Sequence, residues 1–197
     1  MPSRPGSEVS LTHCSNQIAV LVRADQAGAV AAALGVAPGR AVRDGDGTLV
    51  TRTAPDAWLL LAPAGYHVES ITERIESYAD GDFASVVDVT HGHTVVRLHG
   101  SAAASVLSRV CAIDLGEAAT PDGTVFGSLV AGISATVVRD DVDGERSYLV
   151  RCDRSYGRYL IDVLADASGA HPADRHRSAG KEVGCAHHTG TGRLDPR

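Results

Sequence analysis

The chain of 197 residues contains few aromatic residues, no excess of positive charge and no long hydrophobic run. With two Phe and one Trp, its core must be built mostly from Val, Leu, Ile and Ala. The net charge of −6 gives no basic surface of the kind that nucleic-acid-binding proteins carry, so we expect no nucleic acid as a partner. The longest apolar run, residues 57–62, is far too short to cross a bilayer, and we expect no membrane association.

The sequence also lacks the motifs of the common enzyme classes. It contains no GxGxxG, P-loop, GxSxG or HExxH pattern, so dinucleotide binding, phosphoryl transfer and serine or zinc hydrolysis have no support. The four cysteines are widely separated and form no CxxC pair, and the first residues, MPSRPGSE, contain no apolar segment of a signal peptide. We therefore expect reduced thiols and a cytoplasmic location.

What the sequence does contain is an ordered series of short periodic segments. Alternating apolar residues predict strands at 17–23, 48–53, 86–89, 94–99, 124–130, 133–139 and 147–152. Residues 57–62 are apolar on both faces and predict a central strand. Helical periodicity predicts helices at 26–34, at 68–78, after Ser101 and between 155 and 167, with Asp25, Ser101 and either Asp153 or Ser155 as N-caps. Asp143-Gly144 predicts a hairpin turn.

Two halves of the chain share one order of elements. Residues 17–79 run strand, helix, strand, strand, helix, and residues 94–167 repeat this order. The repeat predicts an α+β fold in which each half places its helices on one face of a mostly antiparallel sheet, and the halves pack as one domain. We expect residues 1–16 to form a flexible N-terminal arm, 17–167 the domain, and 168–197 a flexible polar tail.

Several polar groups have both a functional and a simpler interpretation. His91 and His93 form an H-x-H pair without a third metal ligand at suitable spacing, which favours two solvated imidazoles. The acidic run at residues 140–144 fails the EF-hand pattern and favours an acidic hairpin tip. The tail contains a further set of candidate metal ligands without a structural frame: His171, His176, Cys185, His187 and His188.

Asp88 is the acid of most interest, because it interrupts an apolar strand. A buried carboxylate needs a partner, so Asp88 either accepts from backbone amides near Thr90 or grips a cationic amine, and we favour the backbone role. Arg154 is a candidate partner for Asp88. Taken together, these patterns predict no catalytic, cofactor-binding or metal-binding residue in this chain.

Five segments carry a resemblance to a known family. They are DAWLLLAP (56–63), VVDVT (86–90), TVVRLHG (94–100), CAIDL (111–115) and RSYGRYL (154–160). In this order they resemble the gamma subunit of heterotetrameric sarcosine oxidase and, more distantly, the folate-binding aminomethyltransferase of the glycine cleavage system. The resemblance covers roughly residues 17–167. It implies two ferredoxin-like halves in one domain, in agreement with the repeat.

The resemblance implies a non-catalytic accessory subunit of a complex that oxidatively demethylates sarcosine to glycine and transfers the one-carbon unit to tetrahydrofolate. Its partners would be alpha, beta and delta subunits, and FAD, FMN, NAD and tetrahydrofolate would bind to those subunits rather than to this chain. In the folate enzymes a functional acid follows a Gly-Gly-Ile segment, whereas the comparable residues 131–136 here contain no acid. The alternative is a stand-alone folate-binding protein or aminomethyltransferase-like one-carbon enzyme.

Overall fold

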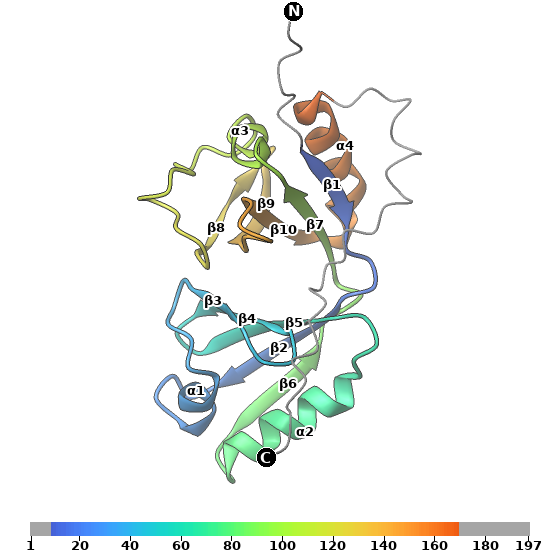
Figure 1. Cartoon of the computed structure of the whole chain (residues 1–197). Coiled ribbons are helices and arrows are strands. Elements are labelled where there is room, and N and C mark those ends of the chain that lie inside the picture. Colours follow the sequence, from blue (N-terminus) through green and yellow to red (C-terminus); the bar gives the residue numbers. More distant parts are fainter. Residues whose placement is uncertain (1–8, 170–197) are drawn as a thin grey trace, which may run out of the picture.

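The computed structural model describes residues 9–169, which form two five-stranded antiparallel sheets and their helices (Figure 1). Sheet I has the order β3-β4-β5-β2-β6 and carries α1 and α2. Its elements are β2 (Ile18–Ala24), α1 (Ala29–Leu34), β3 (Ala41–Arg43), β4 (Leu49–Ala54), β5 (Ala57–Ala62), α2 (Val68–Ala79) and β6 (Ala84–Asp88).

Sheet II has the order β1-β7-β10-β9-β8 and carries α3 and α4. Its elements are β1 (Ser10–His13), β7 (His93–His99), α3 (Ala103–Leu107), β8 (Val125–Val130), β9 (Ile133–Arg139), β10 (Ser147–Asp153), the 3₁₀ turn η1 (Arg154–Tyr156) and α4 (Gly157–Ser168). Within residues 9–169, no helix combines the length and apolar character needed to cross a membrane.

The two sheets follow the same plan, which confirms the predicted α+β fold with two ferredoxin-like halves. In sheet I the strands β6, β2, β5 and β4 lie side by side in the order expected of a ferredoxin-like unit, with β3 added at the edge. In sheet II the strands β1, β7, β10 and β9 occupy the same places, with β8 at the edge. The fourth strand of the second half therefore comes from the start of the chain.

This arrangement corrects the expectation of a flexible arm through residue 16. Ser10–His13 form β1, which pairs antiparallel with β7 from Ser10 opposite His99 to His13 opposite Val96. Leu11 also packs against the core of sheet II. The segment lacks a convincing periodicity because it is only four residues long, yet it closes the edge that β7 would otherwise expose.

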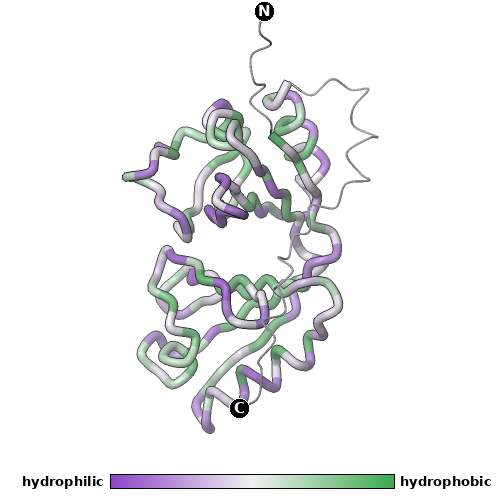
Figure 2. The backbone as a smooth tube through the Cα atoms, in the orientation of Figure 1, coloured by the Kyte–Doolittle hydropathy of each residue, from purple (hydrophilic) through white to green (hydrophobic). Residues whose placement is uncertain are grey.

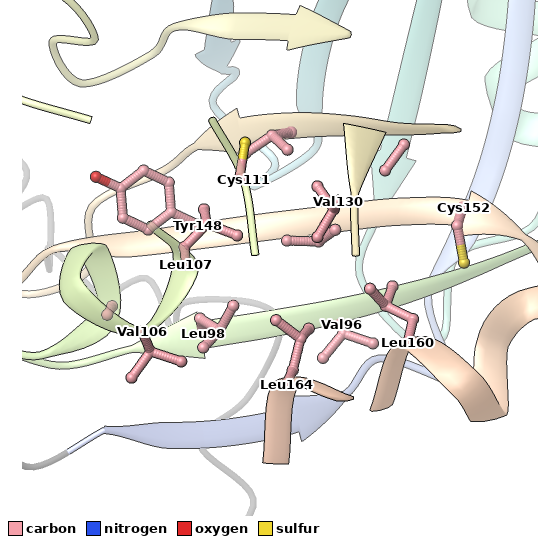
Figure 3. Close-up of a cluster of buried hydrophobic side chains, with 14 of the residues drawn as sticks. Val96, Leu98, Val106, Leu107, Cys111, Val130, Tyr148, Cys152, Leu160 and Leu164 are labelled. Carbon is pink, nitrogen blue, oxygen red and sulfur yellow. The ribbon is translucent and has the colours of Figure 1, made fainter. Parts of the chain in front are cut away.

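Apolar side chains fill three layers. One cluster lies between sheet I and its helices, and a second lies between sheet II and its helices; Figure 3 shows Val96 and Leu98 of β7 against Leu160 and Leu164 of α4. The third cluster lies between the sheets and includes Leu59 of β5 and Leu149 of β10. Figure 2 shows the matching hydrophobic stretches along the strands of both sheets. The helices thus cover the outer faces, and the inner faces meet.

The central strand is the clearest case of sequence dictating structure. All six residues of β5 are buried, because β5 lies between β4 and β2 and has cores on both faces. Trp58 is fully buried, and the guanidinium of Arg52 lies 4.6 Å from its ring centroid. The prediction of a central strand is confirmed.

Two local predictions need correction. Ser101 does not cap α3, whose N-cap is Ala102 without a side-chain bond, and Asp25 accepts from the Ala27 amide in a turn that precedes α1. In contrast, Asp153 accepts from the Ser155 amide at 2.8 Å and caps η1 as predicted.

Two of the cysteines, Cys111 and Cys152, are free and buried in the core of sheet II. Cys14 is buried too, but it is disulfide-bonded, which contradicts the expectation of a reduced thiol at that position. Cys185 lies outside the described residues.

Candidate functional site

A buried ion cluster joins the two sheets. Asp140, at the end of β9, accepts from Arg97 of β7 at 2.6 Å and from Arg43 of β3 at 2.5 Å and 3.1 Å. Arg97 is 2% exposed, and it also donates to the Ser147 hydroxyl at 2.6 Å. Burial lowers the pKa of Arg97, while the adjacent carboxylate opposes that shift. Arg43 belongs to sheet I, so the cluster ties one half to the other.

A second ion cluster is centred on Arg139, the residue that precedes Asp140. Arg139 makes two contacts with Asp141, at 2.7 Å and 3.1 Å, and pairs with Glu117 at 2.7 Å. The hydrogen bonds that Arg139 donates to the Asp141 carboxylate raise the pKa of Arg139 above its usual range. Arg146 joins the same Glu117 at 3.0 Å. Each arginine of the two clusters thus contacts at least one carboxylate.

These clusters correct the interpretation of residues 140–144 as an acidic hairpin tip. Asp140 is buried and Asp141 is half-buried, and both are ion-paired. Only Asp143 and Gly144 form the tip, with φ values of 52° and 78°, and Val142 bridges to Glu145 across it. Positive φ at both central residues is the signature of a type I′ hairpin, so the turn predicted from Asp-Gly is confirmed.

Asp88 takes the backbone role that we favoured. Its Oδ1 accepts from the Thr90 amide at 2.9 Å, and this bonding to Thr90 lowers the pKa of the carboxyl group. The residue is exposed, because β6 is the edge strand of sheet I rather than a buried one. Arg154 donates to the His91 carbonyl at 3.2 Å instead of pairing with Asp88.

The two histidines of the H-x-H pair have different surroundings. His91 is exposed, whereas His93 is partly buried and its Nε2 lies 2.8 Å from Nη2 of Arg151. Burial, together with that guanidinium, lowers the pKa of His93. Among residues 9–169 no group of three His, Cys, Asp or Glu side chains is placed to hold a metal ion. The histidines and the cysteine predicted in the tail lie outside the described residues.

Sequence reasoning missed a pocket on the inner face of sheet II. It has a volume of about 230 Å³ and is lined by His93 of β7, Ser134 and Thr136 of β9, and Arg151 of β10. We call it the inner-face pocket. The sequence contains one signal for this pocket. Side chains alternate across a strand, so Arg151 lies on the same face as Leu149, which packs between the sheets.

Strand β9, which follows a hairpin turn from β8, forms one wall of this pocket through Ser134, Ala135 and Thr136. Ala131 and Gly132 have φ values of 52° and 81° and make a two-residue turn between Val130 and Ile133. Residues 131–136 are the stretch in which the resemblance leads one to look for a functional acid, and they contain none. The pocket wall therefore presents hydroxyls, from Ser134 and Thr136, beside the Arg151 cation.

A larger depression lies beside the start of α1. Its volume is about 480 Å³, and Arg23, Asp56 and Phe83 are among its lining residues. Arg23 and Asp56 pair with each other at 2.9 Å, and Phe83 is 77% exposed. The one arginine that lines this depression is therefore already paired with a carboxylate.

Comparisons with known proteins bear on what this fold does. A sequence profile described as the Sarcosine oxidase, gamma subunit family matches residues 21–170. The chain belongs to this family. The resemblance drawn from the five sequence segments is thereby confirmed.

Two relatives carry the same name. The sarcosine oxidase subunit gamma of Arthrobacter sp is 28% identical over 143 residues, which cover 71% of this chain and 68% of that protein. The one from Corynebacterium sp. (strain P-1) is 29% identical over 122 residues, which cover 62% of this chain and 57% of that protein. The chain thus aligns with about two thirds or less of each relative's length.

Solved structures agree with this assignment. A chain of heterotetrameric sarcosine oxidase from Corynebacterium sp. U-96, in complex with pyrrole 2-carboxylate, superposes with a TM-score of 0.71 and 25% identity, covering 83% of this chain and 85% of that one. Glycine cleavage system aminomethyltransferase T from Bartonella henselae gives a TM-score of 0.61 at 18% identity, over 81% of this chain and 46% of that one. The second match shows a shared fold.

Proposed function

We propose that this chain is the non-catalytic gamma subunit of a heterotetrameric sarcosine oxidase-like complex in the cytoplasm. Its partners would be alpha, beta and delta subunits, and FAD, FMN, NAD and tetrahydrofolate would bind to those partners. The complex would oxidise sarcosine to glycine and pass the one-carbon unit to tetrahydrofolate. The proposal is carried by the family match over residues 21–170, together with the superposition on 85% of a chain from a heterotetrameric sarcosine oxidase.

The chemistry of the described residues supports an accessory role. In the two ion clusters each arginine contacts a carboxylate, and the cluster centred on Asp140 ties Arg43 of sheet I to sheet II. Residues 131–136 supply no general acid or base at the place where the folate enzymes have one. These features suit a chain whose contribution is a rigid surface for other chains.

A deletion experiment in the native host tests the proposal. Removal of the chain should reduce the amount of assembled, flavin-containing complex, while the sarcosine turnover per bound flavin in the residual complex stays near the wild-type value. A tagged copy of the chain should restore the yield and co-purify with flavin-bearing chains. Sarcosine turnover by the isolated, flavoprotein-free chain would contradict the non-catalytic role, and a tagged chain that captures no flavoprotein would contradict the accessory role.

A further inference from the structure

The inner face of sheet II changes character along its strands. At one end Arg97 pairs with the carboxylate of Asp140, and in the middle Val95 and Leu149 pack against sheet I. At the other end Arg151 lies opposite Thr136 of β9 and Val95 of β7 in the strand register. Because side chains alternate across a strand, Arg151 shares its face with Leu149 and points into the inner-face pocket.

Arg151 is half-buried, and it differs from the buried Arg97 and Arg139 in having no counterion among residues 9–169. Arg97 and Arg139 each contact at least one carboxylate, whereas Arg151 forms no ion pair with any residue between 9 and 169. Its Nε is buried without a hydrogen-bond acceptor, and burial lowers the pKa of the guanidinium. A desolvated charge is costly unless it is paired, so an anion beside the Arg151 guanidinium would be stabilising.

The carboxylate of Asp153 does not serve as the counterion of Arg151. It lies at the rim of the pocket, where its Oδ1 accepts from the amide and the hydroxyl of Ser155 at 2.8 Å and 2.6 Å. Those bonds hold the group in the turn that begins η1. The positive charge of Arg151 therefore faces the pocket.

The remaining lining groups can complete an anion site. Arginine only donates, so Nε2 of His93 accepts from Arg151 at 2.8 Å, which makes the imidazole neutral. Ser134 and Thr136 add hydroxyl donors on the opposite strand. One guanidinium and two hydroxyls match the two oxygens of a carboxylate. A phosphate dianion fits less well, because the pocket has one cation and the Asp153 carboxylate at its rim.

We propose that the inner-face pocket binds a single carboxylate group through Arg151, with Ser134 and Thr136 as further donors. The carboxylate belongs either to a free small acid or to an acidic side chain of another subunit. The second source rests on the proposed function, whereas the first does not.

Acetate is the probe for the first test, used with the full chain. Acetate replaces chloride at constant ionic strength while NMR follows the Arg151 Nε–H signal and the His93 ring. We expect a saturable shift of the Arg151 signal, and a higher pKa of His93 with acetate because a nearby negative charge favours the imidazolium. An Arg151 shift that stays linear to the highest concentration, with a His93 response that is equal in wild type and Arg151→Met, would overturn the proposal.

Variants of the chain distinguish a loss of acetate binding from a folding defect. Arg151→Met should abolish the saturable response of His93, and Arg151→Lys should retain it at about tenfold weaker affinity, since lysine keeps the charge but loses the two-pronged geometry. Thr136→Val should weaken binding without changing charge. Arg158→Met is the matched control, because Arg158 is 95% exposed on α4, and its response should equal the wild-type one.

Assembly experiments separate the two sources of the carboxylate. If a partner supplies it, Arg151→Met should weaken association with the flavin-bearing chains at least tenfold relative to Arg158→Met, and acetate should compete with assembly. If a free acid supplies it, assembly should be the same in both variants while acetate binding is lost only in Arg151→Met. A chain that assembles normally but never binds acetate saturably would refute the carboxylate site and leave the accessory role intact.

Discussion

The ion cluster at Asp140 makes the sharpest prediction about stability. Asp140→Asn keeps the size of the side chain but removes the negative charge that Arg97 and Arg43 share. Arg97 is 2% exposed, so it would remain as a buried cation without a counterion. Removing one partner of a buried pair in this way typically costs about 3–5 kcal/mol. In a domain of this size, that loss of unfolding free energy lowers the melting temperature by roughly 6–20 °C.

Urea unfolding followed by circular dichroism measures this loss. With a slope of about 2 kcal/mol per molar urea, the midpoint should fall by roughly 1.5–2.5 M. Asp56→Asn is the matched control, because the Arg23–Asp56 pair has the same chemistry but both side chains are more than half exposed, and its loss should stay below about 1 kcal/mol. Equal, small losses in both variants would refute the argument that burial makes the Asp140 cluster important.

A second prediction concerns close packing: a methyl group on Gly157 would lie 2.9 Å from Cβ of Thr94, so Gly157→Ala should cost about 1–3 kcal/mol and Thr94→Ala should recover part of it. Gly127→Ala, with no atom within 4 Å of the new methyl, should be close to neutral in the same urea assay. A third concerns pH: burial, reinforced by a neighbouring acid, raises the pKa of Asp44 to about 6. Its contribution to stability is therefore present below pH 4 and lost as the pH rises to 6, by about 1 kcal/mol or less because the side chain is partly exposed to solvent, and Asp44→Asn should abolish that loss in urea titrations across this range. A fourth is that Arg151→Met raises the urea midpoint in carboxylate-free buffer, because it removes a desolvated cation that has no counterion.

Local signals in the sequence were sufficient for most elements. The apolar run at residues 57–62 could only be satisfied by a strand with cores on both faces, and β5 is that strand. Asp143-Gly144 dictated its turn because both positions need a positive φ. Such features depend on neighbours in the chain, and the repeat of the two halves followed from their order.

Contacts between distant strands could not be predicted from such local patterns. Asp140 meets Arg97 across 43 residues and Arg43 across 97 residues, so no local pattern distinguishes a buried ion cluster from an acidic hairpin tip. The same holds for Arg151, whose importance lies in the absence of a counterion among residues 9–169. Alternation along β10 places its side chain, but the sequence does not show which acids reach it.

The N-terminal strand gives the last prediction and separates two views of residues 1–16. If they formed a flexible arm, removing residues 1–13 would leave stability unchanged. In the structure, that truncation deletes β1, breaks its ladder with β7 and exposes the core beside Leu11. Several lost hydrogen bonds at about 0.5–1.5 kcal/mol each, with the lost burial, amount to at least about 3 kcal/mol. The bare edge of β7 should also promote aggregation, measurable by light scattering. Removing residues 1–8 keeps β1 and should behave as the full chain does. Equal stability of the two truncations would show that β1 contributes nothing to sheet II.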